Sequence, residues 1–327
     1  MNSFGRIFRV SIWGESHGNS VGIVVDGVPA GIELSEQEMM ADLARRKSGA
    51  VGTTPRVEAD QPNIISGLFE GHTTGAPLTI LFSNTNTRSG DYAKLKAQPR
   101  PSHADFTGMT KFDGWNDPRG GGHFSGRLTL GLVAAGVIAK KILNKATFQT
   151  NIVELGGSHN VEEFEEIVLS AVAAGDSVGG VIECRVDGLP VGMGEPFFDS
   201  VESVVAHALF AVPAVKGVEF GAGFECARMR GSEHNDPIIN KEGVTLTNNA
   251  GGIVGGITNG NQFVVRTAIK PTASIAMEQQ TYNFATNKVE PLEIGGRHDA
   301  CIAMRAGVVV ESAIAIALAD LYLLGKK

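Results

Sequence analysis

Four short segments of the sequence, three of them rich in glycine, carry the side chains best suited to chemistry. They are residues 14–18, 100–105, 119–123 and 295–299, and each contains a histidine. Histidine and aspartate can transfer protons, arginine binds anions, and glycine lets the backbone come close to a ligand. Because these residue types recur together, we expect them to build one site for an anionic ligand.

Cations in an acidic chain support the same expectation. The chain has 28 Lys and Arg residues against 35 Asp and Glu, a net charge of −7. A general surface for nucleic acid or for an anionic membrane is therefore not expected, and an anionic ligand needs a local basic pocket. Residues 45–47 are Arg-Arg-Lys, a cluster that could also simply offset the dipole at the end of a helix. The other candidate cations are Arg56, Arg100, Arg119, Arg127, Lys270, Arg297 and Arg305.

Signatures of several other protein classes are missing from the sequence. It has neither a GxSxG nucleophile motif nor a GxxxxGK[ST] phosphate-binding loop. His17, His103, His123 and Asp299 could bind a metal by type, but they lack the close spacing of metal ligands. The three cysteines form no CxxC pair, and the N-terminus has no apolar signal sequence. We therefore expect reduced thiols and a cytoplasmic protein.

The elements that must position these segments occur twice along the chain. The motif Val-Asp-Gly-x-Pro-x-Gly at 25–31 returns at 186–192. Each copy follows a β-branched run, which predicts a strand ending in an Asp-Gly turn. After each copy a capping box predicts a helix, the first from Ser35 and the second from Asp199. A third helix is predicted from Asn160, with Gly175 as its C-cap.

We interpret this order as an internal duplication, although short Asp-Gly turns can also recur by chance. The halves would span about 1–150 and 175–327 and pack as one domain. Hairpins mixed with amphipathic helices favour layered elements of the α+β class. Each half ends in a long apolar helix, at 127–143 and at 305–323, which we expect to be buried rather than to span a membrane.

These segments closely resemble the chorismate synthase family along nearly the whole chain. One matching block alone is a weak signal, whereas eight or more blocks in the same order are highly specific. The matching blocks are Gly14-Glu15-Ser16-His17-Gly18, Asp26-Gly27-x-Pro29-x-Gly31, Ser66-Gly67-x-x-x-Gly71-x-Thr73-Thr74-Gly75, Arg100-Pro101-x-His103-Ala104-Asp105, Asp117-x-Arg119-Gly120-Gly121-Gly122, Ala214-Val215-Lys216-Gly217-Val218-Glu219, Gly251-Gly252-Ile253-x-Gly255-Gly256-Ile257, Lys270-Pro271-Thr272-x-Ser274-Ile275 and Gly296-Arg297-His298-Asp299-x-Cys301.

The resemblance implies a reaction, a fold and an assembly. The implied reaction is an anti-1,4-elimination that converts 5-enolpyruvylshikimate 3-phosphate to chorismate and phosphate. The enzyme would be a carbon–oxygen lyase that needs reduced FMN without net redox change, with NADPH serving only as a reductant of the flavin. The substrate carries two carboxylates and a phosphate, which suits the arginines in the loops. The implied fold is a β-α-β sandwich with internal pseudo-twofold duplication, assembled as a homotetramer.

The resemblance also implies roles for individual residues. His103 would protonate the departing phosphate, His17 would supply a proton near the flavin, and Asp299 would help the flavin N5 atom to remove the C6 proton. Arg46 would contact the nicotinamide cofactor in members that reduce their own flavin. The implied FMN contacts are His123, Phe124, Ser125, Pro213, Ala214, Gly255, Lys270, Pro271, Thr272, Ala273, Ser274, Arg297 and Arg46. The implied substrate contacts are Ser16, Arg45, Arg46, Arg100, Arg127 and Arg297.

The sequence departs from the family pattern near the implied FMN phosphate contact. His123 stands where the family usually has arginine, and Leu128 where it usually has glutamate. Two alternatives therefore stay open at this point. One is a phosphate-ester hydrolase that uses the same His, Asp and Arg residues, with or without a metal. The other, which the His123 change favours, is a flavin-binding protein without catalytic activity.

Overall fold

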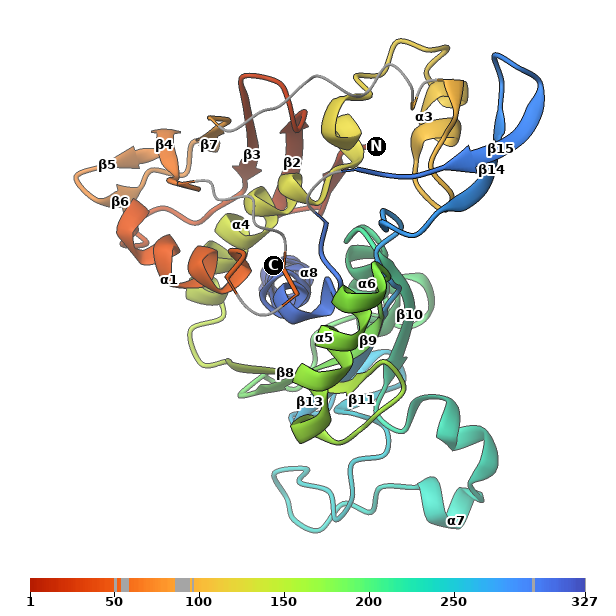
Figure 1. Cartoon of the computed structure of the whole chain (residues 1–327). Helices are drawn as coiled ribbons and strands as arrows, with labels where there is room; N and C mark the ends of the chain where they lie inside the picture. Colours follow the sequence, from red (N-terminus) through yellow and green to blue (C-terminus); the bar gives the residue numbers. More distant parts are fainter. Residues whose placement is uncertain (50–51, 54–58, 86–94, 96, 296–297, 327) are drawn as a thin grey trace.

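Two antiparallel sheets enclose a layer of helices in the computed structural model, which describes residues 1–49, 52–53, 59–85, 95, 97–295 and 298–326 (Figure 1). This arrangement is the predicted β-α-β sandwich of the α+β class. The first sheet, in the order β1-β2-β3-β7-β4, consists of Ser3–Phe4, Arg9–Gly14, Ser20–Asp26, Leu78–Ser83 and Asn63–Ser66. The second, in the order β10-β13-β9-β8, consists of Val215–Phe220, Phe263–Ile269, Gly180–Asp187 and Thr147–Leu155.

The remaining strands form three small hairpins, and the helices differ widely in length. In β7 and β13 every second residue is buried, as expected for a strand with one face on the core. The hairpin strands are β5 (Leu68–Phe69), β6 (His72–Thr73), β11 (Ile253–Val254), β12 (Ile257–Thr258), β14 (Gln279–Asn283) and β15 (Lys288–Leu292).

The α-helices are α1 (Glu36–Arg46), α3 (Asp105–Lys111), α4 (Thr129–Ile142), α5 (Phe164–Ala174), α6 (Val201–Phe210), α7 (Gly231–His234) and α8 (Ala303–Gly325). The 3-10 helices are η1 (Arg119–Phe124), η2 (Gly126–Leu128), η3 (Val161–Glu163), η4 (Phe197–Asp199) and η5 (Gly223–Arg228).

The two sheets repeat one topology, which is the predicted duplication. The order β2-β3-β7-β4 matches β8-β9-β13-β10 strand by strand. Even the hydrogen bonds of the repeated motif recur: Thr73 Oγ1 donates to the Pro29 carbonyl, and Thr258 Oγ1 to the Pro190 carbonyl, both at 2.7 Å. Each hydroxyl also accepts from the backbone N–H three residues after that proline, at 3.0 and 2.9 Å. The division into halves at 1–150 and 175–327 within one domain stays a prediction.

The central helices α4 and α8 pack against each other between the sheets. Gly136 allows this contact, because a Cβ atom there would lie 2.4 Å from the Ser312 Cβ. Helix α8 is long and apolar enough to cross a membrane, yet 78% of its most apolar stretch is buried in the protein. Asp320, near its end, accepts backbone hydrogen bonds of 2.7–3.0 Å from residues 6–8. The predicted buried helices at 127–143 and 305–323 therefore correspond to α4 and α8.

Two of the three predicted helix starts match the structure. Helix α1 begins after Ser35 with the predicted capping box. Helix α5 follows the short η3 turn capped by Asn160, and it ends at Gly175 in the left-handed conformation, φ 66°. The predicted cap of α6 was wrong by one residue. Ser200, not Asp199, caps it by accepting from the N–H three residues on at 3.1 Å.

A buried carboxylate in the middle of α8 joins three helices and a strand. Glu311 is 2% exposed and takes two hydrogen bonds from Arg45 of α1, at 2.9 and 2.7 Å. It also pairs with Lys140 of α4 and accepts from the Thr150 hydroxyl of β8 at 2.9 Å. Burial alone would raise the pKa of Glu311, but hydrogen bonds and charges of Arg45 and Lys140 hold it below its usual range.

Glu311→Gln should lower the free energy of unfolding by about 1.5–3 kcal/mol, because it removes the buried charge that accepts hydrogen bonds from Arg45 and Lys140, while both cations keep their pairs with Asp42. The loss should shrink as the pH falls below the ordinary pKa of glutamate, and it should disappear only below the lowered pKa of native Glu311, where that carboxylate is itself protonated. Urea denaturation at several pH values, at fixed protein concentration, measures both effects. Asp199→Asn, which breaks an exposed pair with Arg6, is the control and should cost less than about 1 kcal/mol. An equal cost for the two variants would contradict the role of Glu311.

Candidate active site

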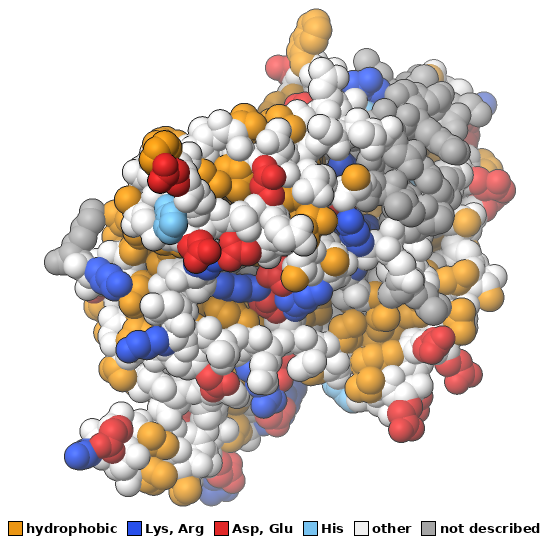
Figure 2. Space-filling view, turned by 90° about the vertical axis from the view of Figure 1, so that its left-hand side faces the viewer, with side chains coloured by type: hydrophobic (Ala, Val, Ile, Leu, Met, Phe, Trp, Pro, Cys, Tyr) orange, Lys and Arg blue, Asp and Glu red, His pale blue; other side chains and the backbone are white. Residues whose placement is uncertain are grey.

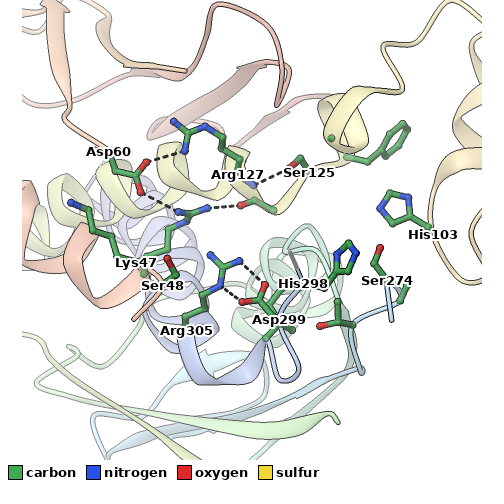
Figure 3. A pocket seen from close by; sticks show the side chains of 17 residues that line it. Lys47, Ser48, Asp60, His103, Ser125, Arg127, Ser274, His298, Asp299 and Arg305 are labelled. Carbon is green, nitrogen blue, oxygen red and sulfur yellow. Dashed lines mark hydrogen bonds and ion pairs between the residues drawn. The ribbon is translucent and has the colours of Figure 1, made fainter. Parts of the chain in front are cut away.

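The N-terminal ends of α4 and α8 meet the C-terminal end of α1 around a cavity of about 300 Å³, the basic cavity (Figure 3). Three of the four segments singled out in the sequence contribute to its wall, through His103, Gly120, His298 and Asp299. Segments nearly 200 residues apart thus meet at one place, as the residue types predicted. The distribution of charge is different on the outer face of the molecule on the side of α1, where acidic and basic side chains lie in mixed groups (Figure 2).

Three arginines and two aspartates form one end of the basic cavity. Arg127 Nη1 donates to Asp60 at 2.9 Å, and Arg46 Nη1 lies 3.6 Å from the same carboxylate. Arg305 donates two hydrogen bonds to Asp299, at 3.0 and 2.7 Å. The three arginines come from the last turn of α1, from η2 just before α4, and from the first turn of α8. The bonds to the aspartates fix the guanidinium groups in place.

The charge at this end of the cavity is not balanced. With Lys47, the wall carries four cationic side chains against the carboxylates of Asp60 and Asp299. Burial, followed by the nearby charge of Arg305, lowers the pKa of Arg46 to about 9, so it stays charged at neutral pH. An anion in the cavity would offset this excess positive charge and favour the protonated arginine. The cavity is therefore built for a ligand with negative groups.

Two histidines and a serine line the opposite side of the basic cavity (Figure 3). His103 Nδ1 lies 2.8 Å from Asp105. Burial is the main reason that the pKa of His298 is lowered, and its Nε2 lies 3.3 Å from the Gly295 carbonyl. A ligand in the cavity would thus have arginines at one end and imidazoles at the other. In the described part of the chain, no three His, Cys, Asp or Glu side chains are grouped to hold a metal ion.

A second and larger cavity of about 640 Å³, the apolar cavity, shares a wall with the first. Its lining is mostly apolar and includes Leu132 of α4, Val212 and Pro213 after α6, and Ile316 of α8. His103 and Thr272 line both cavities. Among the described residues the Thr272 hydroxyl is buried and has no hydrogen-bond partner. A cavity of this size and character, with an unused polar group, suits an organic cofactor.

The first glycine-rich segment supports the wall of the cavities without lining it. Gly120, Gly121 and Gly122 all have positive φ, 59°, 81° and 54°, which side chains other than glycine rarely adopt. A Cβ atom on Gly120 would lie 2.2 Å from the ring of His17, so only glycine fits against this histidine. The Ser16 N–H donates to the Gly122 carbonyl at 3.0 Å. His17 and Ser16 therefore lie directly behind the glycine turn.

The structure distributes the implied FMN contacts mainly over the apolar cavity. Ser274 and Arg46 line the basic cavity instead. Gly255 lies at the turn between β11 and β12 and lines neither cavity, and Arg297 lies outside the described residues. The contacts that line the apolar cavity are His123, Phe124, Ser125, Pro213, Ala214, Lys270, Pro271, Thr272 and Ala273.

Of the implied substrate contacts, Arg46 and Arg127 line the basic cavity. Arg45 lies outside both cavities because its guanidinium binds Glu311 and Asp42. Arg100 also lies outside, since it binds Asp105 behind His103. A helix presents neighbouring residues on different faces, so only one member of the Arg45-Arg46 pair can point into the cavity.

Sequence reasoning missed Asp60, Ser48 and the pairing of Arg305 with Asp299. Asp60 is 6% exposed and has φ 48°, an uncommon conformation for a residue with a side chain. Its neighbours in the sequence do not distinguish it from a surface carboxylate. Arg305 was only one of several candidate cations. Its partner stands six residues earlier, in the loop before α8, so helix periodicity could not connect the two.

Comparison with known proteins agrees with this geometry. The family model for chorismate synthase matches residues 8–323. A chorismate synthase from Chitinophaga pinensis is 59% identical over 100% of this chain and 98% of its own length, and one from Methanosarcina acetivorans is 45% identical over 98% and 95%. A crystal structure of chorismate synthase superposes with a TM-score of 0.75 at 27% identity, covering 98% of this chain and 93% of that one. The chain therefore belongs to the chorismate synthase family.

Proposed function

We propose that the basic cavity binds 5-enolpyruvylshikimate 3-phosphate, that the apolar cavity binds reduced FMN, and that the chain catalyses the anti-1,4-elimination of phosphate to give chorismate. Family membership already makes the chain a lyase of aromatic amino acid biosynthesis. The proposal adds the cofactor and the residues. One observation carries it: the basic cavity and the apolar cavity share a wall that contains His103.

The arginines of the basic cavity would orient the substrate through its carboxylate and phosphate groups. Arg46 and Arg127 are 6% and 7% exposed, so their charges act in a medium where water screens them little. Arg127 is fixed from behind by Asn84, Asp60 and the Ser83 carbonyl. Because these groups are already in place, binding the substrate requires little rearrangement of the protein.

The apolar cavity fits a flavin ring in size and in lining. Phe124, Pro213 and Ala214 supply apolar surface, and Lys270 supplies a cation. Reduced FMN would provide electron density to the developing cation or radical and return unchanged, so no net oxidation occurs. The His123 departure lies in this wall, where Nδ1 is 2.8 Å from the Gly14 carbonyl. We propose that His123 is a tolerated variation of the usual arginine.

Three residues would move protons. His103 at the shared wall would give a proton to the departing phosphate, which is a poor leaving group until its charge is neutralised. His17, behind Gly120, would supply a proton near the flavin. Asp299, which accepts two hydrogen bonds from Arg305, would assist removal of the C6 proton. The positions of His103 and Asp299 on one cavity support a common substrate for the two.

Thr272→Val should weaken binding of FMN about 5–10-fold, the usual net value of one hydrogen bond. The ligand-free protein should be at least as stable as before, because a buried hydroxyl without a described partner is removed. Anaerobic titration with reduced FMN gives the affinity, and thermal unfolding gives the stability. Thr286→Val is the matched control, because the exposed Thr286 hydroxyl donates to the Glu290 carboxylate. Unchanged FMN affinity in Thr272→Val would place the flavin elsewhere.

Isotope labelling tests the proposed reaction against phosphate-ester hydrolysis. Elimination breaks the carbon–oxygen bond, so the phosphate released in ¹⁸O-water keeps its four original oxygens. Hydrolysis by attack of water on phosphorus would place one ¹⁸O atom in the phosphate. Mass spectrometry of the product separates these outcomes. Labelled phosphate from the complete system would overturn the proposal.

We further propose that the enzyme is cytoplasmic and works as a homotetramer. NADPH would serve only to reduce the flavin, with Arg46 as its implied contact. Support for these points is the family resemblance alone. Light scattering at working concentration tests the assembly.

A further inference from the structure

We infer that Asp105, held by Arg100, is a positioning residue that fixes the His103 imidazole with its proton on Nδ1 and its Nε2 available to the ligand. The inference rests on the proposed function for the use of that proton. It concerns the geometry of His103, however, and can be tested without turnover.

Arg100 and Asp105 form a rigid buried pair behind His103. Asp105 accepts from Arg100 Nε and Nη2, each at 2.7 Å, and from the Arg100 backbone N–H at 3.1 Å. Arg100 Nη1 also lies 3.3 Å from the Ser274 hydroxyl, which lines the basic cavity. Arg100 is 8% exposed, and its three side-chain nitrogens all have partners in the protein. Its guanidinium therefore holds Asp105, His103 and Ser274 in place.

The same pair determines which nitrogen of His103 carries the proton. His103 Nδ1 lies 2.8 Å from Asp105 Oδ1 and 3.0 Å from Arg100 Nη2. Arginine can only donate and an ionised carboxylate can only accept, so Nδ1 cannot satisfy both. The contact with the charged Asp105 carboxylate is the shorter of the two. We therefore assign the Nδ1 proton to the bond with Asp105, which leaves Nε2 as the ring nitrogen that can exchange a proton with the ligand.

The free edge of the ring faces the glycine turn. A Cβ atom on Gly121 would lie 3.4 Å from His103 Cε1 and 3.7 Å from Nε2. The absence of a side chain there leaves this edge open. The charged groups that share a cavity with His103 include His298, Asp299 and Lys270, and Asp117 lines a smaller pocket beside it. The carboxylate in contact with the ring is that of Asp105, at 2.8 Å.

Asp105 stays ionised over the pH range in which histidine titrates. Burial alone would raise its pKa, but hydrogen bonds from Arg100 and then from His103 hold the pKa of Asp105 well below its usual range. A carboxylate on Nδ1–H favours the imidazolium form of histidine, which is the form that can donate a proton from Nε2.

Asp105→Asn tests this assignment because it keeps the size of the side chain and removes its charge. We expect kcat to fall about 10–100-fold, as when a histidine loses its orienting carboxylate, while KM for the substrate changes less than about 3-fold. The alkaline limb of the pH profile, where a general acid loses its proton, should also move to lower pH, which a merely structural role would not cause. Asp113→Asn, at an exposed position just after α3, is the matched control and should behave as the wild type.

Nitrogen-15 NMR of the histidine side chains gives the independent readout in the ligand-free protein. The spectrum of His103→Gln identifies the His103 signals. The wild type should show the Nδ1–H form at high pH, and Asp105→Asn should show loss of that preference. An unchanged tautomer or an unchanged kcat in folded Asp105→Asn would overturn the inference. If the wild type itself gives no chorismate, the proposed function fails, and the NMR result still decides the role of Asp105.

Discussion

His103→Ala should lower kcat for the elimination by about 10²–10⁴-fold, the usual loss when a general acid is removed. The expectation is large because His103 lines both cavities and its ring is oriented by Asp105. The fold should survive, since His103 is at the cavity wall and not in the apolar core. Anaerobic single-turnover kinetics with reduced FMN and saturating substrate measure the chemical step directly.

His159→Ala is the matched control for this prediction. His159 is largely exposed and lines neither the basic nor the apolar cavity, so turnover should be unchanged. Near-normal turnover of folded His103→Ala would contradict the assignment of His103. The absorption spectrum of bound reduced FMN shows in addition whether His103 acts on the phosphate or on the flavin. If His103→Ala changes the protonation of the flavin and leaves phosphate release intact, His103 acts on the cofactor, and the roles of His103 and His17 must be exchanged.

Asp299→Asn should lower kcat by about 10²–10⁴-fold as well, because a neutral amide cannot assist removal of the C6 proton as a carboxylate would. FMN affinity should change much less, since Asp299 lines only the basic cavity. Substrate deuterated at C6 sharpens the measurement. In the variant, proton removal should become more rate-limiting, and the isotope effect on kcat should increase.

The matched control for Asp299→Asn is Asp176→Asn, at an exposed aspartate that accepts from the Ser177 N–H. Asparagine can accept the same bond, so no change is expected. An unchanged elimination rate in Asp299→Asn would reject its proposed role. A loss of substrate affinity without a loss of kcat would instead mean that Asp299 only positions Arg305.

The sequence predicted the fold well where local patterns repeat. The β-branched runs before each Asp-Gly turn became β3 and β9, and the long apolar segments became α4 and α8. The duplication was visible because its turn requires the same residues in both halves: Gly27 and Gly188 both have positive φ, 72° and 81°. The order of strands within each sheet could not be predicted, because strands pair over long separations that no local pattern records.

The candidate site was predicted in its residue types more than in its contacts. Glycine-rich segments with histidine and arginine do meet around one cavity. Sequence could not separate Arg46 from Arg45, because the choice depends on how α1 packs against α4 and α8. Nor could it find Asp60, whose importance comes from its place between Arg46 and Arg127. Long-range pairing of buried charges is the part of the site that only the three-dimensional structure reveals.

Anaerobic conversion of 5-enolpyruvylshikimate 3-phosphate, with and without chemically reduced FMN, tests the proposed elimination most directly when chorismate and phosphate are followed together. We predict equal release of both products, and only with reduced FMN. Phosphate without chorismate, or equal rates in the absence of flavin, would contradict it. Neither product, with FMN still bound, would indicate that the two cavities bind flavin and anion without performing the elimination.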